Sequence, residues 1–284
     1  MSMRLYIIRH GQTEWNSSYR LQGRTDIPLN ENGRELAKKT GAALQGISFT
    51  CAYTSPLVRA RETARLVLSA AGCVPEPPET DTGRDMKKTL PQPKAMASGE
   101  RHAADSSGQD PASKQAERTG GARKAVRLLD ELRLQEISFG EMEGERVRDN
   151  NGVLTDENYI RFFGSPETYI PPKGAESFES LLERTGDFLK ELKSGELQKK
   201  LMVSHDRPQN KLLPVHCEPE NILISTHGAA SRALLANISG CPLRDFWCGG
   251  VPKNCAVTIV DLEDGEWKIK ERDKIYYDNE NIGL

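Results

Sequence analysis

The chain has 284 residues, of which 37% are apolar and 28% charged, and its 39 basic and 41 acidic side chains leave a formal net charge of −2. A charge this close to zero excludes a general attraction to nucleic acid or to an anionic membrane surface, so anion binding requires a local cluster of cations. No stretch approaches the roughly eighteen apolar residues of a membrane span, and we expect neither such a span nor a secretory signal.

The six cysteines contain no CxxC pair. A chain of this length does not need disulfide bonds to stabilise a small core, so the cysteines are predicted to be reduced thiols of a cytoplasmic protein. Their spacing gives no structural zinc site, and no metal or other cofactor is expected.

Strand and helix patterns alternate in the first part of the chain. They are, in order, a strand over 5–8, a helix over 31–44, a strand over 49–53 and a helix beginning at Ser55 and Pro56. The first strand is a short, continuous apolar run, which is typical of a parallel strand covered on both faces. Asn30 is a suitable N-cap for the first helix, and the Ser-Pro pair is expected to supply an N-cap and a proline at the first helical position.

Residues 76–125 contain no valine, isoleucine or aromatic side chain, and prolines, glycines and charges are frequent. Such a segment cannot bury enough apolar surface to offset an ordering entropy of about 1–2 kcal/mol per residue. We expect a polar, mobile insertion within a single domain that spans residues 1–284. Two functional alternatives stay open, a binding arm and a lid over the active site.

The alternation resumes after the insertion. The predicted elements are strand material over 128–139, a helix over 177–193, a strand over 221–225, a helix over 229–238, and strands over 256–262 and 267–271 that flank Asp264-Gly265. The Asp-Gly pair predicts a hairpin. The pattern therefore predicts an α/β fold, a three-layer αβα sandwich whose central sheet is mostly parallel and carries an antiparallel hairpin at one edge.

Two histidines follow strands of this predicted sheet. His10 lies between Arg9 and a glycine after the first strand, and His227 precedes a glycine after the strand over 221–225. Open α/β sheets bind ligands beyond the carboxyl ends of their strands, so both rings are expected at one edge. The simpler alternative is that each histidine merely ends its strand.

Two further residues carry chemistry in unusual positions. Arg59 lies in the first turn of its helix, where the unpaired N–H groups favour anions rather than cations. An anion bound between the Arg59 guanidinium and these N–H groups would explain why an arginine occupies this position. If residues 128–139 form a strand, Leu132, Leu134 and Glu136 lie on the same face of it. Glu136 then occupies a position where the pattern predicts an apolar side chain. A partly buried glutamate has a raised pKa and can donate a proton, although a glutamate at a strand end can also simply face water.

Together these residues resemble a known family. The matching segments, in order, are Arg9-His10-Gly11-Gln12-Thr13-Glu14-Trp15-Asn16, Arg20-Leu21-Gln22-Gly23-Arg24-Thr25, Thr54-Ser55-Pro56-Leu57 with Arg59, Leu134-Gln135-Glu136 with Glu143-Gly144, Glu176-Ser177, and Ser225-Thr226-His227-Gly228. The set is similar to the histidine phosphatase superfamily, in its phosphoglycerate mutase-like branch. It covers most of the chain outside residues 76–125 and a looser region over 201–219.

The resemblance implies roles for nine residues. His10 is the nucleophile that becomes a phosphohistidine, Glu136 donates a proton to the leaving oxygen, and the phosphate pocket consists of Arg9, Asn16, Arg59 and His227. Gln22 and Gly23 are expected to touch the phosphate or the substrate, and Arg20 to form part of the substrate wall. His102, His205 and His216 are interpreted as surface residues.

The expected function is hydrolysis of a small phosphorylated metabolite, a phosphomonoester, through a phosphohistidine and without a metal. Two alternatives stay open, namely a cofactor-dependent phosphoglycerate mutase and a catalytically silent binding module that uses the insertion. A mutase must hold a bisphosphorylated intermediate, and beyond Arg20 and Arg24 the sequence offers no clear further cluster of cations for it. The small-molecule ester is the expected partner, nucleic acid and membrane are not expected, and a homodimer is an open alternative.

Overall fold

The computed structural model describes residues 3–76, 124–149, 153–197 and 220–278. Seven strands lie in this part of the chain: β1 (Met3–Arg9), β2 (Phe49–Thr54), β3 (Val74–Pro75), β4 (Ala125–Asp130), β5 (Glu220–Thr226), β6 (Val257–Glu263) and β7 (Glu266–Lys274). They form one sheet in the order β3-β4-β2-β5-β1-β6-β7. The insertion predicted over 76–125 lies outside the described residues except at its two ends.

The sheet is parallel except at one edge. The pairs β3–β4, β4–β2, β2–β5 and β5–β1 are parallel, whereas β6 runs antiparallel to both β1 and β7. The hairpin between β6 and β7 turns through Asp264 and Gly265, whose φ angles of 53° and 79° lie in the left-handed region that a tight turn requires. The predicted α/β fold with an antiparallel edge hairpin is confirmed.

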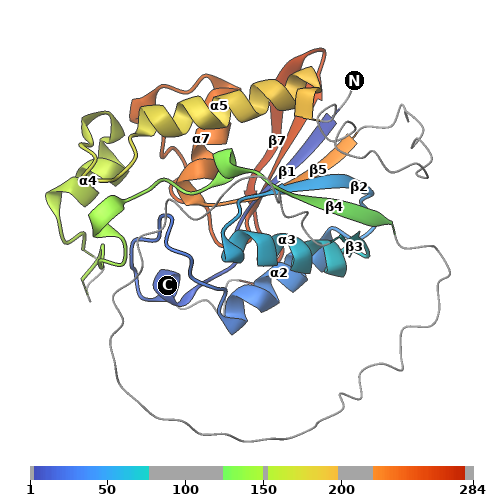
Figure 1. The fold of residues 1–284 in the computed structure, drawn as a ribbon, viewed down its shortest axis with the longest axis horizontal. Coiled ribbons are helices and arrows are strands. Elements are labelled where there is room, and N and C mark those ends of the chain that lie inside the picture. The colour runs from blue at the N-terminus through green and yellow to red at the C-terminus, as the bar shows by residue number, and fades with distance from the viewer. Residues whose placement is uncertain (1–2, 77–123, 150–152, 198–219, 279–284) are drawn as a thin grey trace, which may run out of the picture.

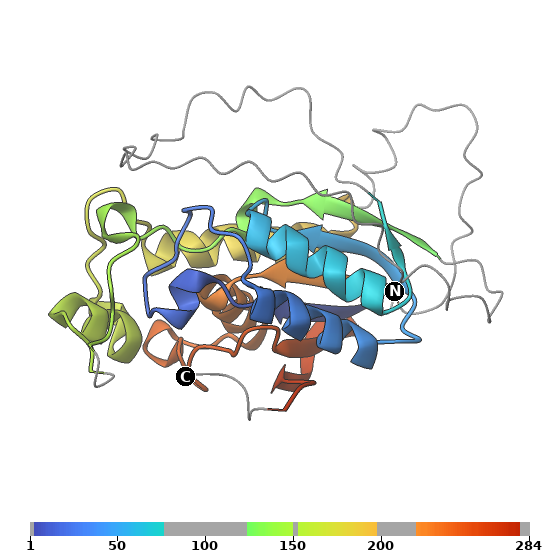
Figure 2. The same cartoon turned by 90° about the horizontal axis from the view of Figure 1, so that it is seen from below.

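Helices cover both faces of this sheet (Figure 1). The α-helices of the described residues are α1 (Glu14–Ser17), α2 (Glu31–Ala43), α3 (Val58–Ala70), α4 (Glu157–Gly164), α5 (Phe178–Ser194) and α7 (Gly228–Ser239). Helices α2 and α3 lie side by side on one face, and α5 packs with α7 on the other (Figures 1 and 2). None of the described helices combines the length and the apolar character needed to cross a membrane.

Alternate side chains of the central strand β1 enter two different cores. Tyr6 and Ile8 pack in the cluster that contains the buried faces of α2 and α3, whereas Leu5 and Ile7 pack with residues of α5 and α7. Burial on both faces explains why the strand is apolar throughout rather than alternating. A third cluster, rich in aromatic rings, lies between α4, α5 and α7.

Side chains cap the N-termini of two helices, and the cap at Asn30 is the predicted one. The side chain of Asn30 accepts a hydrogen bond from the Gly33 N–H at 2.8 Å, and that of Ser177 accepts one from the Ser180 N–H at 3.2 Å. Gly195 ends α5 in the left-handed conformation, with φ at 75°. The predicted N-cap at Ser55 is wrong, because α3 begins at Val58 without a side-chain cap.

The prediction of a strand over 128–139 is correct only for its first residues, 128–130. Strand β4 ends at Asp130, and a 3₁₀ turn, η3 (Leu132–Leu134), follows it. The Glu131 carboxylate accepts a hydrogen bond from the Arg133 N–H at 3.0 Å and so caps this turn. Leu132 is 57% exposed whereas Glu136 is only 7% exposed. Glu136 is thus buried as expected. It lies in the loop that follows η3, however, and not on the buried face of a strand.

Candidate active site

The two histidines meet at the carboxyl edge of the sheet. His10 follows β1 and His227 follows β5, which are paired neighbours, and the His10 N–H donates to the Thr226 carbonyl at 2.9 Å. The ring centroids are 5.1 Å apart, and the two residues are 3% and 0% exposed. The predicted meeting of both rings at one edge is confirmed.

His10 is held in one tautomer. Its Nδ1 lies 2.7 Å from the Gly11 carbonyl oxygen, and because a carbonyl can only accept, Nδ1 carries the hydrogen. The Nε2 atom is then unprotonated and makes no hydrogen bond with a described residue. Burial, followed by the charges of Arg59 and Arg9, lowers the pKa of His10 well below its ordinary 6.5. The ring is therefore a neutral nucleophile at neutral pH.

Arg59 is fully buried, and backbone carbonyls hold its guanidinium. The Nη1 atom donates to the Thr25 carbonyl at 2.9 Å and Nη2 to the Gly23 carbonyl at 2.6 Å. Burial lowers the Arg59 pKa to about 10, which leaves it charged at neutral pH. Arg9, the residue before His10, is anchored by a hydrogen bond from its Nη1 to the Pro252 carbonyl.

Glu143 fixes the loop that holds Arg59. Its carboxylate accepts hydrogen bonds from the Arg24 N–H at 2.8 Å and the Thr25 N–H at 2.7 Å. A Cβ at Gly23 would lie 2.2 Å from Glu143 Oε1, so only glycine fits beneath this carboxylate. Gly23 thus holds Arg59 through its carbonyl, and its expected contact with the phosphate or the substrate stays a prediction.

Glu136 lies at the N-terminus of α7. Its Oε1 accepts from the Ile137 and Ala230 N–H groups, both at 3.0 Å, and its Oε2 accepts from the Ala229 N–H at 3.1 Å. Burial raises the pKa of Glu136, and these backbone hydrogen bonds oppose the rise without cancelling it. The carboxyl group is therefore able to hold and release a proton.

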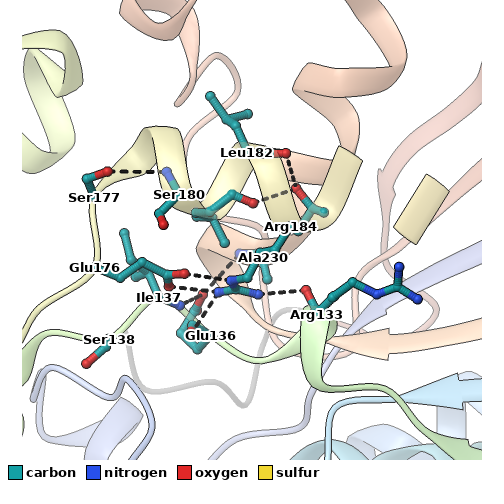
Figure 3. Close-up of polar contacts among 12 residues, drawn as sticks. Arg133, Glu136, Ile137, Ser138, Glu176, Ser177, Ser180, Leu182, Arg184 and Ala230 are labelled. Atoms are coloured by element: carbon teal, nitrogen blue, oxygen red, sulfur yellow. Dashed lines mark hydrogen bonds and ion pairs between the residues drawn. The ribbon is translucent and has the colours of Figure 1, made fainter. Parts of the chain in front are cut away.

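Arg184 of α5 supports the segment that carries Glu136 (Figure 3). Its guanidinium donates to the Arg133 carbonyl at 2.6 Å and to the Glu136 carbonyl at 3.2 Å. Glu176 holds Arg184 through two hydrogen bonds, of 2.7 and 2.9 Å. Glu176 belonged to a recognised motif, but nothing in the sequence singled out Arg184, because its partners lie about fifty residues earlier.

Several buried nitrogen atoms around His10 have no hydrogen-bond partner among the described residues. They are Arg9 Nε, Gln22 Nε2, Arg59 Nε and His227 Nδ1. The other ring nitrogen of His227, Nε2, lies 2.7 Å from Ser55 Oγ, a partner that the sequence had placed at a helix cap. The nitrogens on Arg9, Gln22 and Arg59 are donors, and buried donors without a partner are costly and rare in proteins, so this cluster is shaped for an oxygen-rich ligand.

A cavity of about 120 Å³ opens beside these groups. Of the predicted site residues, its lining includes Arg9, His10, Asn16, Arg20, Gln22 and Glu136, while Arg59, His227 and Gly23 lie outside the lining. The sequence did not point to Asn254, whose Nδ2 donates to the His10 carbonyl at 3.0 Å and to Asn16 Oδ1 at 3.3 Å. His102, His205 and His216 lie outside the described residues.

Parts of the chain are similar in sequence to known proteins. A 67-residue stretch, 24% of the chain, is 46% identical to a 2,3-bisphosphoglycerate-dependent phosphoglycerate mutase of Gloeobacter violaceus. A 61-residue stretch, 22% of the chain, is 44% identical to an uncharacterized phosphatase of Bacillus subtilis. These matches span only 31% and 32% of the relatives' own lengths.

Solved structures match over nearly the whole chain. An alpha-ribazole phosphatase from Shigella flexneri aligns with a TM-score of 0.58 and 22% identity, over 96% of each chain. A phosphoglycerate mutase from Bacillus anthracis aligns with a TM-score of 0.59 and 23% identity, over 96% of this chain and 93% of its own. At these identities the likeness shows the shared fold. The family model of the histidine phosphatase superfamily (branch 1) matches residues 5–83, 75–215 and 211–274, and the chain belongs to this superfamily.

Proposed function

We propose that the protein is a phosphomonoester hydrolase that acts on a small phosphorylated metabolite through a phosphohistidine at His10. The observation that carries the proposal is the set of unpaired buried nitrogens on Arg9, Gln22, Arg59 and His227, next to a neutral His10 with a free Nε2. A phosphoryl group supplies the oxygen acceptors that the donors on Arg9, Gln22 and Arg59 lack.

In the first step, His10 Nε2 attacks phosphorus and the bond to the ester oxygen breaks. Arg9 and Arg59 donate N–H groups to the non-bridging oxygens, where charge is greatest in the transition state. Glu136 gives its proton to the departing oxygen, so that an alcohol leaves rather than an alkoxide. The enzyme then carries a phosphohistidine and an ionised Glu136.

In the second step, Glu136 accepts a proton from water as the water oxygen attacks phosphorus. The bond between phosphorus and Nε2 breaks, inorganic phosphate leaves, and His10 and Glu136 return to their first states. The arginines supply the positive charge in this scheme, so no metal ion is needed in it.

The charge of the cavity favours hydrolysis over the mutase alternative. Among the described residues that line it, only Arg9 and Arg20 are cations, and the Arg20 Nη1 donates to the Gly144 carbonyl at 2.6 Å. A mutase needs further cations to hold a bisphosphorylated intermediate and must exclude water.

The test measures phosphate release from small monoesters in the presence of EDTA, with wild type and His10→Ala compared. We expect turnover by wild type, loss of at least about a thousandfold in His10→Ala, and an acid-labile phosphoenzyme in wild type alone. Activity of His10→Ala, or a strict need for magnesium, would contradict the mechanism. Transfer of the phosphoryl group to added 3-phosphoglycerate would instead favour the mutase.

A further inference from the structure

The cavity beside His10 has a second wall, and this wall is apolar and aromatic. Its lining includes Phe139, Phe162, Phe163, Trp247 and Val251. Helix α4 supplies Phe162 and Phe163, and Trp247 follows a 3₁₀ turn that comes after α7. None of these residues belongs to the catalytic constellation described above.

The rings of this wall are fixed before any ligand arrives. Phe162 is 2% exposed, and its ring centroid lies 4.9 Å from that of Phe163 and 5.4 Å from that of Trp247. The Trp247 indole N–H donates to the Phe162 carbonyl at 2.6 Å, which orients the indole. A rigid aromatic surface binds a ligand ring with little loss of side-chain entropy.

Part of the wall is open to a ligand. Phe163 and Trp247 are partly exposed, and Val251 is 41% exposed. Val251 also borders the catalytic end, because its Cγ1 lies 3.3 Å from where a Cβ on Gly228 would lie, and Glu136 Oε2 is 3.5 Å from the same position. The apolar surface is therefore continuous with the proton donor, on the side where the leaving group must lie.

We propose that, within the hydrolase function proposed above, this wall is a leaving-group subsite that selects monophosphate esters of apolar alcohols bearing a ring. The phosphate end matches one phosphoryl group, and the rest of the described lining offers Arg20 as its single further cation. A second phosphate or a polyhydroxylated chain would lose its bound water on contact with the aromatic rings and would find no hydrogen-bond partners there to replace that water.

The test compares esters with equivalent alkyl leaving groups, so that leaving-group acidity is nearly constant. Wild type is assayed with 2-phenylethyl phosphate, ethyl phosphate and glycerol 1-phosphate. We expect kcat/KM for the phenylethyl ester to exceed the other two by about tenfold or more, as burial of a ring implies. This comparison needs no variant and so does not depend on whether one folds.

Two variants locate the effect. Phe163→Ala and Val251→Ser should reduce the preference for the ring at least threefold, while Ile160→Ala, an exposed position on the same helix, should leave it unchanged. Similar kcat/KM for all three esters in wild type would overturn the subsite and leave the hydrolase intact. Absence of His10-dependent turnover of every ester would overturn the proposed function, and the subsite with it.

Discussion

His10 and Glu136 face the same cavity, and burial shifts their pKa values in opposite directions. It lowers the pKa of His10 well below 6.5, with help from two arginines, and it raises the pKa of Glu136 above its ordinary 4.5. In both cases the interior favours the neutral form, which is the form each residue needs at the start of the reaction. Desolvation thus prepares a nucleophile and an acid at once.

These shifts predict the pH dependence of kcat/KM for an alkyl ester. On the acid side, activity should rise as pH passes the lowered pKa of His10, because protonation removes the nucleophile. On the alkaline side, activity should fall as pH passes the raised pKa of Glu136, because ionisation removes the acid.

Glu136→Gln should abolish the alkaline limb and lower kcat/KM for ethyl phosphate by about 10²- to 10⁴-fold. Because 4-nitrophenol leaves without protonation, kcat/KM for 4-nitrophenyl phosphate should fall much less. Glu167→Gln, at an exposed position, is the control and should keep the wild-type profile. An alkaline limb that survives in Glu136→Gln would refute the assignment.

Substitution of Gly23 should affect both the stability of the protein and the binding of substrate. In Gly23→Ala the new Cβ would lie 2.2 Å from Glu143 Oε1 and 2.7 Å from the Ile137 carbonyl oxygen. We expect the free energy of unfolding to fall by about 1–3 kcal/mol and KM to rise, because the displaced loop no longer holds Arg59. Urea unfolding and steady-state kinetics measure both effects.

Gly164→Ala is the matched control, because nothing lies within 4 Å of a Cβ at that position. It should change the free energy of unfolding by no more than about 0.5 kcal/mol. Equal stability of the two variants would show that Glu143 does not constrain the loop.

At the scale of elements, Arg184 joins α5 to the Glu136 segment and so connects a surface helix to the chemistry. Arg184→Met removes the donors to the Arg133 and Glu136 carbonyls. We expect kcat for ethyl phosphate to fall about tenfold to a hundredfold, since small displacements of a reacting group are costly. Turnover of 4-nitrophenyl phosphate should fall much less, because its leaving group does not need a proton from Glu136.

The control is Arg161→Met, which removes an exposed ion pair with Glu157 on α4. It should leave both substrates unaffected, because exposed pairs contribute at most about 1 kcal/mol. Equal losses on both substrates in Arg184→Met would indicate general destabilisation rather than positioning of Glu136.

Sequence patterns predicted the elements whose signals are local. Apolar runs were sufficient for the central strands, apolar residues at helical spacing for α5, and the cap at Asn30 marked the start of α2. The cap at Ser55 was wrong because α3 begins only at Val58, and the Ser55 hydroxyl instead pairs with His227, a residue 172 positions away. Helix α4 was missed as well. It is only eight residues long, and its burial depends on distant aromatic partners such as Trp247.

Some residues of the candidate site could be predicted from local sequence signals and others could not. Residues that follow strands, such as His10 and His227, could be placed from strand order alone. Asn254 could not be placed, because it acts on His10 through a contact 244 residues away and no motif contains it. Glu143 belonged to a matching motif, but its contact with the Arg24 N–H, 119 residues away, depends on the folded packing.

At the scale of the molecule, the two ends of the polar insertion meet in the sheet. The Val74 N–H donates to the Lys124 carbonyl at 3.0 Å, and the Glu76 N–H to the Val126 carbonyl at 2.9 Å. Strand β4 begins at Ala125, so the insertion expected over 76–125 overlaps this strand by one residue. A shortened variant must therefore keep both β3 and β4.

Replacement of residues 78–122 by an eight-residue Gly-Ser linker should preserve the fold. The replaced segment has no valine, isoleucine or aromatic residue to contribute to a core, and a shorter connection between β3 and β4 lowers the entropy cost of closing it by about 1–2 kcal/mol. We expect an unchanged or slightly raised Tm and kcat/KM values within about twofold for ethyl and 2-phenylethyl phosphate. A variant with the same residues in scrambled order is the control for length. A changed ratio between the two esters in the linker variant would favour the lid, and a lowered Tm would show that the segment packs on the domain.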